Sequence, residues 1–525
     1  MRKFSLIAIL ILGSQGLAQI GHAAVSTWQG TGTTTTPTTG SWGTATNWSG
    51  GAVPASGATT ELDFAGTAGY TATNNTGTVP FQLNILTFGG SAGTEVLAGT
   101  QLQFVANASL NPVINQNGTA TVTVSAPIDM ANDLTLQGAG TGGMLFSGVV
   151  SGNSQLIINE TGNANVTLSA SNTYSGGTTL TKGSLITQAT GALGTGTVSL
   201  ASKWTINTNA QTFSNAVSLA GAATIDGQSA ATLSGNIALG SSALTLRSSN
   251  ATGTVRTVSG VISGAGSVTK NDNLGAYWIL SGNNTYTGTT TANQGKLAVT
   301  GTTSGQGNYV VGSTSATTSA TLAGNGTIGL AAGKTVTVVG STSAASAAFL
   351  APSDATGADA TVGTLAFVWA GANAANQLTI GNGSNQGVFA VDVAGSGSSD
   401  RLVLGSTAVT ATLNLGSASD TLALNSLAGA FDGSTYTILN YFGTLTGTFD
   451  TLTLNGVTQS SATSFTANGT TYNVVYGVVD PLGGYDIQLQ AVPEPGTLWL
   501  LAAAGLVWIA ARRRLGSDKG CPRGA

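Results

Sequence analysis

The residue types that most often carry out chemistry in proteins are scarce in this chain and stand near its ends. The only histidine is His22 and the only cysteine is Cys521. The body between residues 25 and 490 therefore offers no histidine or cysteine for a Ser-His-Asp triad, a Cys-His pair, a disulfide or a His/Cys-ligated metal. We expect a body without catalysis, metal or cofactor.

Carboxylates are the remaining candidates, since β-helical polysaccharide lyases and hydrolases use clustered carboxylates or Asp-bound calcium. The closest groupings are Glu61 with Asp63, Asp129 with Asp133, and Asp354 with Asp359. None has a basic neighbour nearby in sequence. Asp400 and Arg401 are adjacent, but alternation along a strand directs them to opposite faces. We interpret all of these as structural, solvated positions, and a lyase or hydrolase stays the less favoured alternative.

Charge and composition restrict the partners and the fold class. Only 6% of the residues are charged, and glycine is abundant at 76 residues. Between residues 25 and 490, eight Lys or Arg stand against seventeen Asp or Glu, a net charge of −9. An acidic body disfavours nucleic acid as a partner. Short alternating runs of Val, Ile, Leu and Thr between Gly/Asn turns predict an all-β chain.

The N-terminus has the three parts of a secretory signal peptide, residues 1–23. Arg2 and Lys3 are the positive region, residues 4–12 are apolar, and cleavage is predicted between Ala23 and Ala24. Cleavage after Ala18 is a second option, and an uncleaved membrane anchor is the alternative. We expect Sec-type export and signal peptidase as partners.

The C-terminus has a second tripartite segment, residues 492–514. Pro493, Glu494 and Pro495 precede the apolar stretch 497–511, and a basic cluster follows it, formed by Arg512, Arg513 and Arg514. Fifteen apolar residues rise about 23 Å as a helix, enough for a transmembrane helix in the inner membrane with arginine snorkelling. The arginines would stay cytoplasmic, with residues 515–525 as a cytoplasmic tail. An ordinary tail anchor is the alternative.

This second segment resembles the PEP-CTERM sorting signal of Gram-negative bacteria, which has the same three parts in the same order. The resemblance implies recognition by an exosortase and cleavage near the motif. It implies a protein that is transiently anchored in the inner membrane and then reaches the cell surface or the extracellular matrix. The chain departs from the family in extending beyond the arginines.

Internal repeats decide the predicted architecture of the body. Residues 168–176 (LSASNTYSG) match residues 280–288 (LSGNNTYTG), and flanking matches keep the same offset of 112 residues. Each unit is a short strand, a Gly/Asn turn and another short strand, which buries its apolar residues only by stacking on its neighbours. We predict a right-handed parallel β-helix, a β-solenoid, over residues 66–386.

The repeats also resemble the autotransporter-associated β-strand repeat, with the match at residues 168–185 and 280–297. That family implies a β-helical stalk outside the cell. We expect a Trp-rich N-terminal cap at residues 24–65 and a β-rich, partly antiparallel C-terminal cap at residues 387–490. Trp28, Trp42 and Trp48 are interpreted as the core of the N-terminal cap, with a sugar-stacking platform as the alternative.

The sequence thus predicts an exported, non-catalytic structural protein of the cell surface or matrix, linked by the PEP-CTERM resemblance to exopolysaccharide and biofilm. An adhesin or carbohydrate-binding protein that uses exposed Thr, Asn and Ser faces is the alternative.

Overall fold

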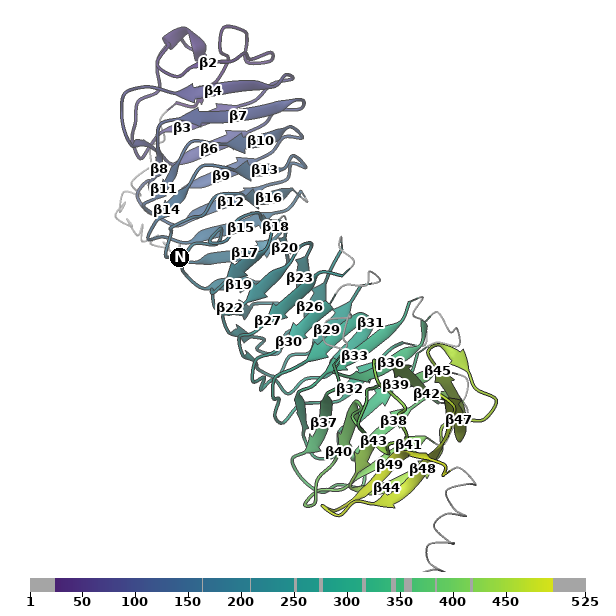
Figure 1. The fold of residues 1–525 in the computed structure, drawn as a ribbon. Helices are drawn as coiled ribbons and strands as arrows, with labels where there is room; N and C mark the ends of the chain where they lie inside the picture. The colour runs from purple at the N-terminus through teal and green to yellow at the C-terminus, as the bar shows by residue number, and fades with distance from the viewer. Residues whose placement is uncertain are drawn as a thin grey trace, which may run out of the picture. The chain divides into compact units, whose positions relative to one another are not determined.

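The computed structural model describes residues 24–493 except 163, 208, 250–252, 273–276, 314–317, 341–345, 354–360, 383–384 and 416–418. Nearly all regular structure in this part is β-strand, with one short 3-10 helix, η1 (Ala45–Asn47). Contacts divide the chain into two units, residues 1–235 and 236–525, which we describe separately. Each is built mainly from stacked parallel strands (Figure 1). The predicted signal helix and membrane helix lie outside the described residues.

The first unit has three faces of parallel strands. The first face is β1 (Ser26–Thr27), β3 (Glu61–Phe64), β6 (Ile85–Phe88), β9 (Val113–Gln116), β12 (Leu134–Gly138), β15 (Leu156–Glu160), β17 (Thr178–Lys182), β19 (Val198–Leu200) and β22 (Val217–Leu219). The second is β2 (Gly40–Ser41), β4 (Tyr70–Asn74), β7 (Thr94–Gly99), β10 (Thr121–Val124), β13 (Met144–Phe146), β16 (Asn165–Leu168), β18 (Ser184–Thr187), β20 (Lys203–Ile206) and β23 (Ala223–Gly227). The third holds β5 (Phe81–Leu83), β8 (Leu102–Phe104), β11 (Ile128–Met130) and β14 (Val150–Gly152), and further along it β21 (Gln211–Phe213) pairs with β24 (Ala231–Leu233).

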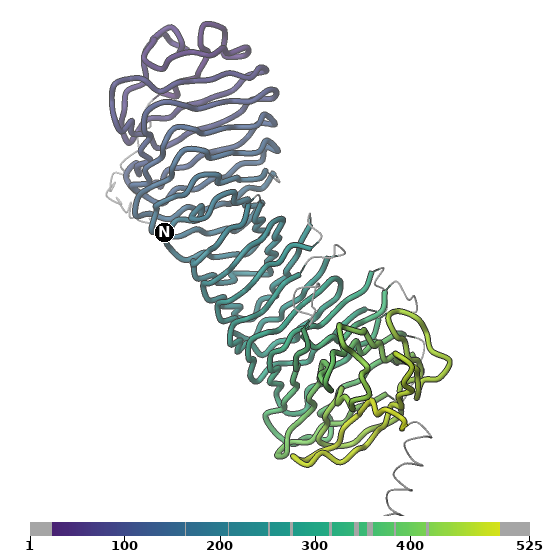
Figure 2. Tube along the Cα trace, viewed as in Figure 1, coloured from purple at the N-terminus to yellow at the C-terminus, as the bar shows by residue number. Residues whose placement is uncertain are grey.

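The chain visits the faces in turn, so successive strands of one face belong to successive rungs (Figure 2). Asp133 and Gln155, bonded between adjacent rungs, are 22 residues apart. Side chains alternate inward and outward along each strand, and residues at the same position of successive rungs stack on one another. Leu136 lies between Ile114 and Ile158, all of them buried. Each such side chain contributes about 1.5–3 kcal/mol by leaving water, so the stacked rungs form the core that one rung alone lacks.

The two sequence repeats build the same internal corner. In the first copy, the Val150 N–H donates to Asn172 Oδ1 over 2.8 Å, and Asn172 Nδ2 donates to the Ala192 carbonyl over 2.7 Å. The buried Tyr174 hydroxyl bonds to Thr178 Oγ1 at 2.6 Å. The second copy repeats two of these bonds: the Ile262 N–H donates to Asn284 Oδ1 over 2.8 Å, and the hydroxyls of Tyr286 and Thr290 are 2.6 Å apart.

The second unit has four groups of paired strands. The first is β25 (Ile237–Ala238) with β28 (Ile262–Ser263). The second is β26 (Leu244–Arg247), β29 (Val268–Asn271), the first half of β31 (Thr290–Val299), β32 (Tyr309–Val311), β35 (Thr335–Val338), β38 (Gln377–Ile380), β41 (Ala411–Leu415) and β44 (Gly443–Gly447). The third is β27 (Val255–Val258), β30 (Tyr277–Leu280), the second half of β31, β33 (Ala320–Gly324), β36 (Ala348–Pro352), β39 (Gly387–Val393), β42 (Asp420–Ser426), β45 (Thr451–Leu454) and the short β46 (Val457–Thr458).

The fourth sheet of this unit mixes parallel and antiparallel pairing. Its parallel strands are β34 (Thr327–Leu330), β37 (Thr364–Trp369), β40 (Arg401–Leu404) and β43 (Tyr436–Tyr441). Its antiparallel strands are β49 (Tyr485–Ala491), β48 (Thr470–Val479) and β47 (Ser464–Ala467). Rungs here are longer: Gly333 and Asn376, bonded between neighbouring rungs, are 43 residues apart.

The parallel β-solenoid architecture agrees with the prediction, and parallel pairing continues into residues 387–490, the segment expected to be a partly antiparallel cap. β39 and β42 still pair in parallel over seven residues. Among the described strands, antiparallel pairing in the sheets begins at β46 and continues through β47, β48 and β49. The longer alternating strands that suggested a separate cap are thus largely further rungs of the coil. The right-handed winding stays a prediction.

Candidate functional site

The three tryptophans considered for sugar stacking form a buried cluster at the start of the coil. Trp28, Trp42 and Trp48 are each 0% exposed. The Trp48 ring meets those of Trp28 and Trp42 edge-on, at centroid distances of 5.1 and 5.5 Å, and Trp42 stacks on Phe64 at 5.8 Å. Because protein covers these rings, the sugar-stacking alternative is wrong for them. Their packing is that of a cap core.

Asp400 and Arg401 point to opposite sides of β40, as strand alternation predicts. Asp400 is buried: its Oδ1 accepts from Ser353 Oγ at 2.6 Å and from the Gly363 N–H at 2.9 Å, and its Oδ2 accepts from the Asp392 N–H at 3.1 Å. Burial raises the pKa of Asp400 to about 7, against these hydrogen bonds, which lower it. Arg401 is exposed. The two side chains do not form a shared site.

Two other carboxylates that lie close together in the sequence form hydrogen bonds between rungs. Gln103 Nε2 donates to Asp129 Oδ2 at 2.7 Å, and Asp133 Oδ1 accepts the Gln155 N–H at 2.9 Å, each from one rung to another. Burial raises the pKa of Asp63 above its usual value. Asp354 and Asp359 lie outside the described residues. Over the described ranges, no three His, Cys, Asp or Glu side chains are grouped as metal ligands.

Some carboxyl groups lie inside the coil, which the sequence did not reveal. Burial raises the pKa of Glu95, Glu160 and Asp420 to about 7 in each case. Glu95 Oε1 accepts the Tyr70 hydroxyl at 3.1 Å, and Asp420 Oδ1 accepts the Asp450 N–H at 2.8 Å. Glu160 is 1% exposed, and neither of its oxygens has a hydrogen-bond partner in the described part of the chain.

The residue that corresponds to Glu160 in the second repeat forms an ion pair. Asp272 stands 112 residues later, and its Oδ2 accepts from Lys270 Nζ at 2.6 Å inside the second unit. In the first copy the position of Lys270 is taken by Ile158. Burial lowers the pKa of Lys270, and the Asp272 charge opposes that change. One copy therefore holds an ion pair where the other holds a single buried carboxyl group.

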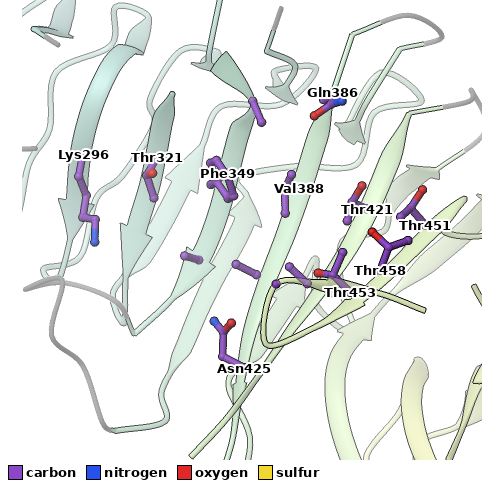
Figure 3. Close-up of a pocket in the computed structure, with 15 residues that line it drawn as sticks. Lys296, Thr321, Phe349, Gln386, Val388, Thr421, Asn425, Thr451, Thr453 and Thr458 are labelled. Atoms are coloured by element: carbon purple, nitrogen blue, oxygen red, sulfur yellow. The ribbon is translucent and has the colours of Figure 1, made fainter. Parts of the chain in front are cut away.

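One surface hollow is a groove of about 720 Å³ in the second unit (Figure 3). It follows the outer face of the sheet formed by β31, β33, β36, β39, β42 and β45. One stacked row of outward residues crosses all six strands: Lys296, Thr321, Phe349, Val388, Thr421 and Thr451. At a strand spacing of about 4.8 Å, this row is about 24 Å long.

The neighbouring outward row of the groove is made of small residues. Ala351, Ala390 and Ala423 line it, and Ala390 pairs with Ala423 before the row ends at Thr453. The alanines two positions along from Phe349 and Val388 leave space between larger side chains. The hollow is therefore a consequence of rung register. The hollow could not be predicted, because the register between rungs cannot be read from sequence spacing.

The chemistry of the groove suits binding rather than bond breaking. Its lining offers hydroxyl groups, the amides of Gln386 and Asn425, the ring of Phe349 and one ammonium group, Lys296. Lys296 Nζ lies 4.8 Å from the centre of the Tyr277 ring. Hydroxyls and amides both donate and accept hydrogen bonds. The described residues that line the groove include no carboxylate to act as an acid or base.

The predicted processing sites are only partly described. Pro493 and Ala24 are exposed. Glu494, Pro495, Arg512, Arg513, Arg514 and Ala23 lie outside the described residues, as do residues 497–511. The described residues contain no helix that is long and apolar enough to cross a membrane.

The fold and the groove define a repeat-built parallel β-solenoid with an open surface hollow. Comparison with protein families identifies three segments that match two families. Residues 160–186 and 276–299 match the passenger-associated-transport repeat, and residues 491–514 match the PEP-CTERM protein-sorting motif. The chain therefore carries a PEP-CTERM sorting motif together with autotransporter-associated repeats, as the sequence analysis predicted.

A curated relative extends the autotransporter comparison. The chain is 30% identical over 283 residues to "Adhesin BmaC autotransporter" of Brucella suis biovar 1 (strain 1330). The match covers 52% of this chain and 8% of that protein. Together with the two family matches, it indicates an exported, cell-surface-directed protein of a Gram-negative bacterium. The sorting motif implies processing by an exosortase.

Proposed function

We propose that the mature chain is a non-catalytic structural protein of the cell surface or the extracellular matrix, linked to exopolysaccharide and biofilm. One observation carries this proposal: the residues that recur in the repeats bond within the coil. Asn172 and Asn284 hold corners between rungs, and Tyr174 and Tyr286 are fully buried. The recurring residues thus serve the scaffold itself, as expected of a structural body.

The proposed route to the surface follows the two ends of the chain. Signal peptidase cleaves between Ala23 and Ala24 after Sec-type export, and residues 497–511 then hold the chain in the inner membrane. The exosortase acts near Pro493, Glu494 and Pro495 and releases the body. We also assign right-handed winding to the coil and keep residues 24–65 as the N-terminal cap.

Intact-mass analysis of the protein from its native host tests this route. A mass that ends before Thr497 is the expected result. Replacing Pro493, Glu494 and Pro495 by alanine should leave the unprocessed C-terminus in the membrane fraction. A matched alanine triple at Thr458, Gln459 and Ser460, which are exposed or half-buried, should process normally. Retention of residues 512–525 in the wild-type protein would show a plain tail anchor instead.

A carbohydrate-binding adhesin is the second candidate, favoured by the groove and by the similarity to the Brucella protein, which is named an adhesin. An extended glycan lying across the strands would meet one side chain of the row at each rung. Phe349 would lie beneath a sugar ring, and Asn425 would bond to its hydroxyls. A glycan pull-down with the wild type and with Phe349→Ala and Asn425→Ala tests this role. Thr379→Ala, which lies on β38 outside the groove, is the control. Absence of binding to every polysaccharide, with matrix localisation intact, leaves the structural role alone.

A further inference from the structure

A second hollow of the second unit lies apart from the groove, on the outer face of β37, β40 and β43. Its volume is about 280 Å³. Five hydroxyl-bearing residues line it around one guanidinium group: Thr364, Ser398, Ser399, Thr435 and Thr437 around Arg401. Thr364 is the direct register partner of Arg401 on the neighbouring strand. Among the described residues, no carboxylate lines this pocket.

The positive charge of Arg401 is not neutralised by the carboxylates that stand near it in the chain. Across the described ranges, Arg401 takes part in no salt bridge. Asp400 faces the interior and accepts three hydrogen bonds there. Asp432, close to Thr435 in sequence, accepts from the N–H groups of Ser396 and Ser434 and from the Tyr436 hydroxyl. The guanidinium of Arg401 is thus left to face solvent in the pocket.

The negative charge of the rest of the body makes Arg401 a selective point of attachment for an anionic polymer. The body carries a net charge of −9, so an anionic polymer is repelled from most of the surface. A guanidinium presents a planar fork that matches a carboxylate through two parallel hydrogen bonds. Hydroxyl side chains beside that fork donate to and accept from the hydroxyls of a sugar ring.

We propose that this pocket binds one acidic sugar residue, a uronic acid, of an extracellular polysaccharide. The carboxylate of the sugar pairs with Arg401, and its ring hydroxyls bond to Thr364, Ser398 and Thr435. This inference rests on the proposed link with exopolysaccharide and names the class of sugar that the link requires. It is independent of glycan binding in the groove, which lies on a different sheet.

Calorimetric titration of the purified mature protein tests the proposal, with oligomers of galacturonic acid and the matching oligomers of galactose as probes. The wild type should bind the acidic oligomer and not the neutral one. Arg401→Ala should weaken binding about tenfold or more, and Arg401→Lys should give a smaller loss because an ammonium lacks the planar fork. Arg401 is exposed, so both variants should keep the wild-type melting temperature.

One control variant locates the binding. Lys182→Ala, which removes an exposed positive charge of the first unit, should bind the acidic oligomer as the wild type does. The proposal is overturned if Arg401→Ala binds equally well, if the galactose oligomer binds as tightly, or if Lys182→Ala abolishes binding. Equal competition by inorganic sulfate at matched ionic strength would also overturn it, because the pocket would then recognise charge alone. Loss of exosortase processing would leave this binding unchanged, so the two proposals fail separately.

Discussion

The buried carboxyl group of Glu160 should make the first unit less stable as the pH rises. Burial raises its pKa from 4.5 to about 7. Such a carboxyl group costs no folding stability below pH 4.5, where it is protonated in both states. The free energy of unfolding then falls as the pH rises from 4.5 through 7, because the unfolded state ionises first. At about 1.4 kcal/mol for each pH unit, the loss is about 3 kcal/mol at pH 8.

Glu160→Gln removes this ionisation while nearly keeping the side-chain shape. The buried amide itself costs about 1–3 kcal/mol without a partner, at every pH, so the informative quantity is how the difference between variant and wild type changes with pH. Urea unfolding, followed by circular dichroism and by hydrogen exchange at β15 and β17, should show the variant gaining about 3 kcal/mol on the wild type between pH 4 and pH 8.

A surface variant controls for net charge. Lys182→Gln also changes the charge by one unit, at an exposed position of β17, and should leave the pH dependence of unfolding nearly unchanged. If the difference between Glu160→Gln and the wild type is the same at pH 4 and pH 8, then Glu160 titrates normally and the argument from burial is refuted.

Three further outcomes are expected. The whole body should melt at a lower temperature at pH 8 than at pH 5, because three other buried carboxyl groups have pKa values raised to about 7; a melting temperature that rises over this range contradicts the assignment. Asn172→Ala should destabilise the first unit by about 1–3 kcal/mol by leaving the Val150 N–H and the Ala192 carbonyl unpaired, whereas the neighbouring exposed Thr173→Ala should change unfolding by less than about 0.5 kcal/mol. Trp48→Ala should cost about 3–5 kcal/mol and open the cap to limited proteolysis near residue 48; an unchanged cleavage pattern would show that the cap does not depend on this ring.

Much of the scaffold could be predicted from the sequence because its signals are local. Strand alternation, Gly/Asn turns and the 112-residue repeat depend on neighbouring residues, and the structure has parallel rungs as expected. The opposite directions of the Asp400 and Arg401 side chains followed from the same alternation, but the burial of Asp400, which was expected to be solvated, did not.

What escaped prediction depends on register between rungs. Lys296 and Thr451 line one groove although 155 residues separate them, and no spacing in the sequence brings them together. The burial of Glu160 also depends on neighbours from other rungs. The position at which antiparallel pairing begins could not be predicted, because longer alternating strands are compatible with both kinds of sheet.

The register of the groove also bears on how such a protein changes over evolutionary time. Each strand contributes one side chain to the row from Lys296 to Thr451. Duplication of a whole rung inserts one more side chain into the row and lengthens it by about 4.8 Å, without disturbing contacts beyond the adjacent rungs. The length of this surface row can therefore be selected in discrete steps by gene duplication, while point substitutions within a rung alter only its local chemistry.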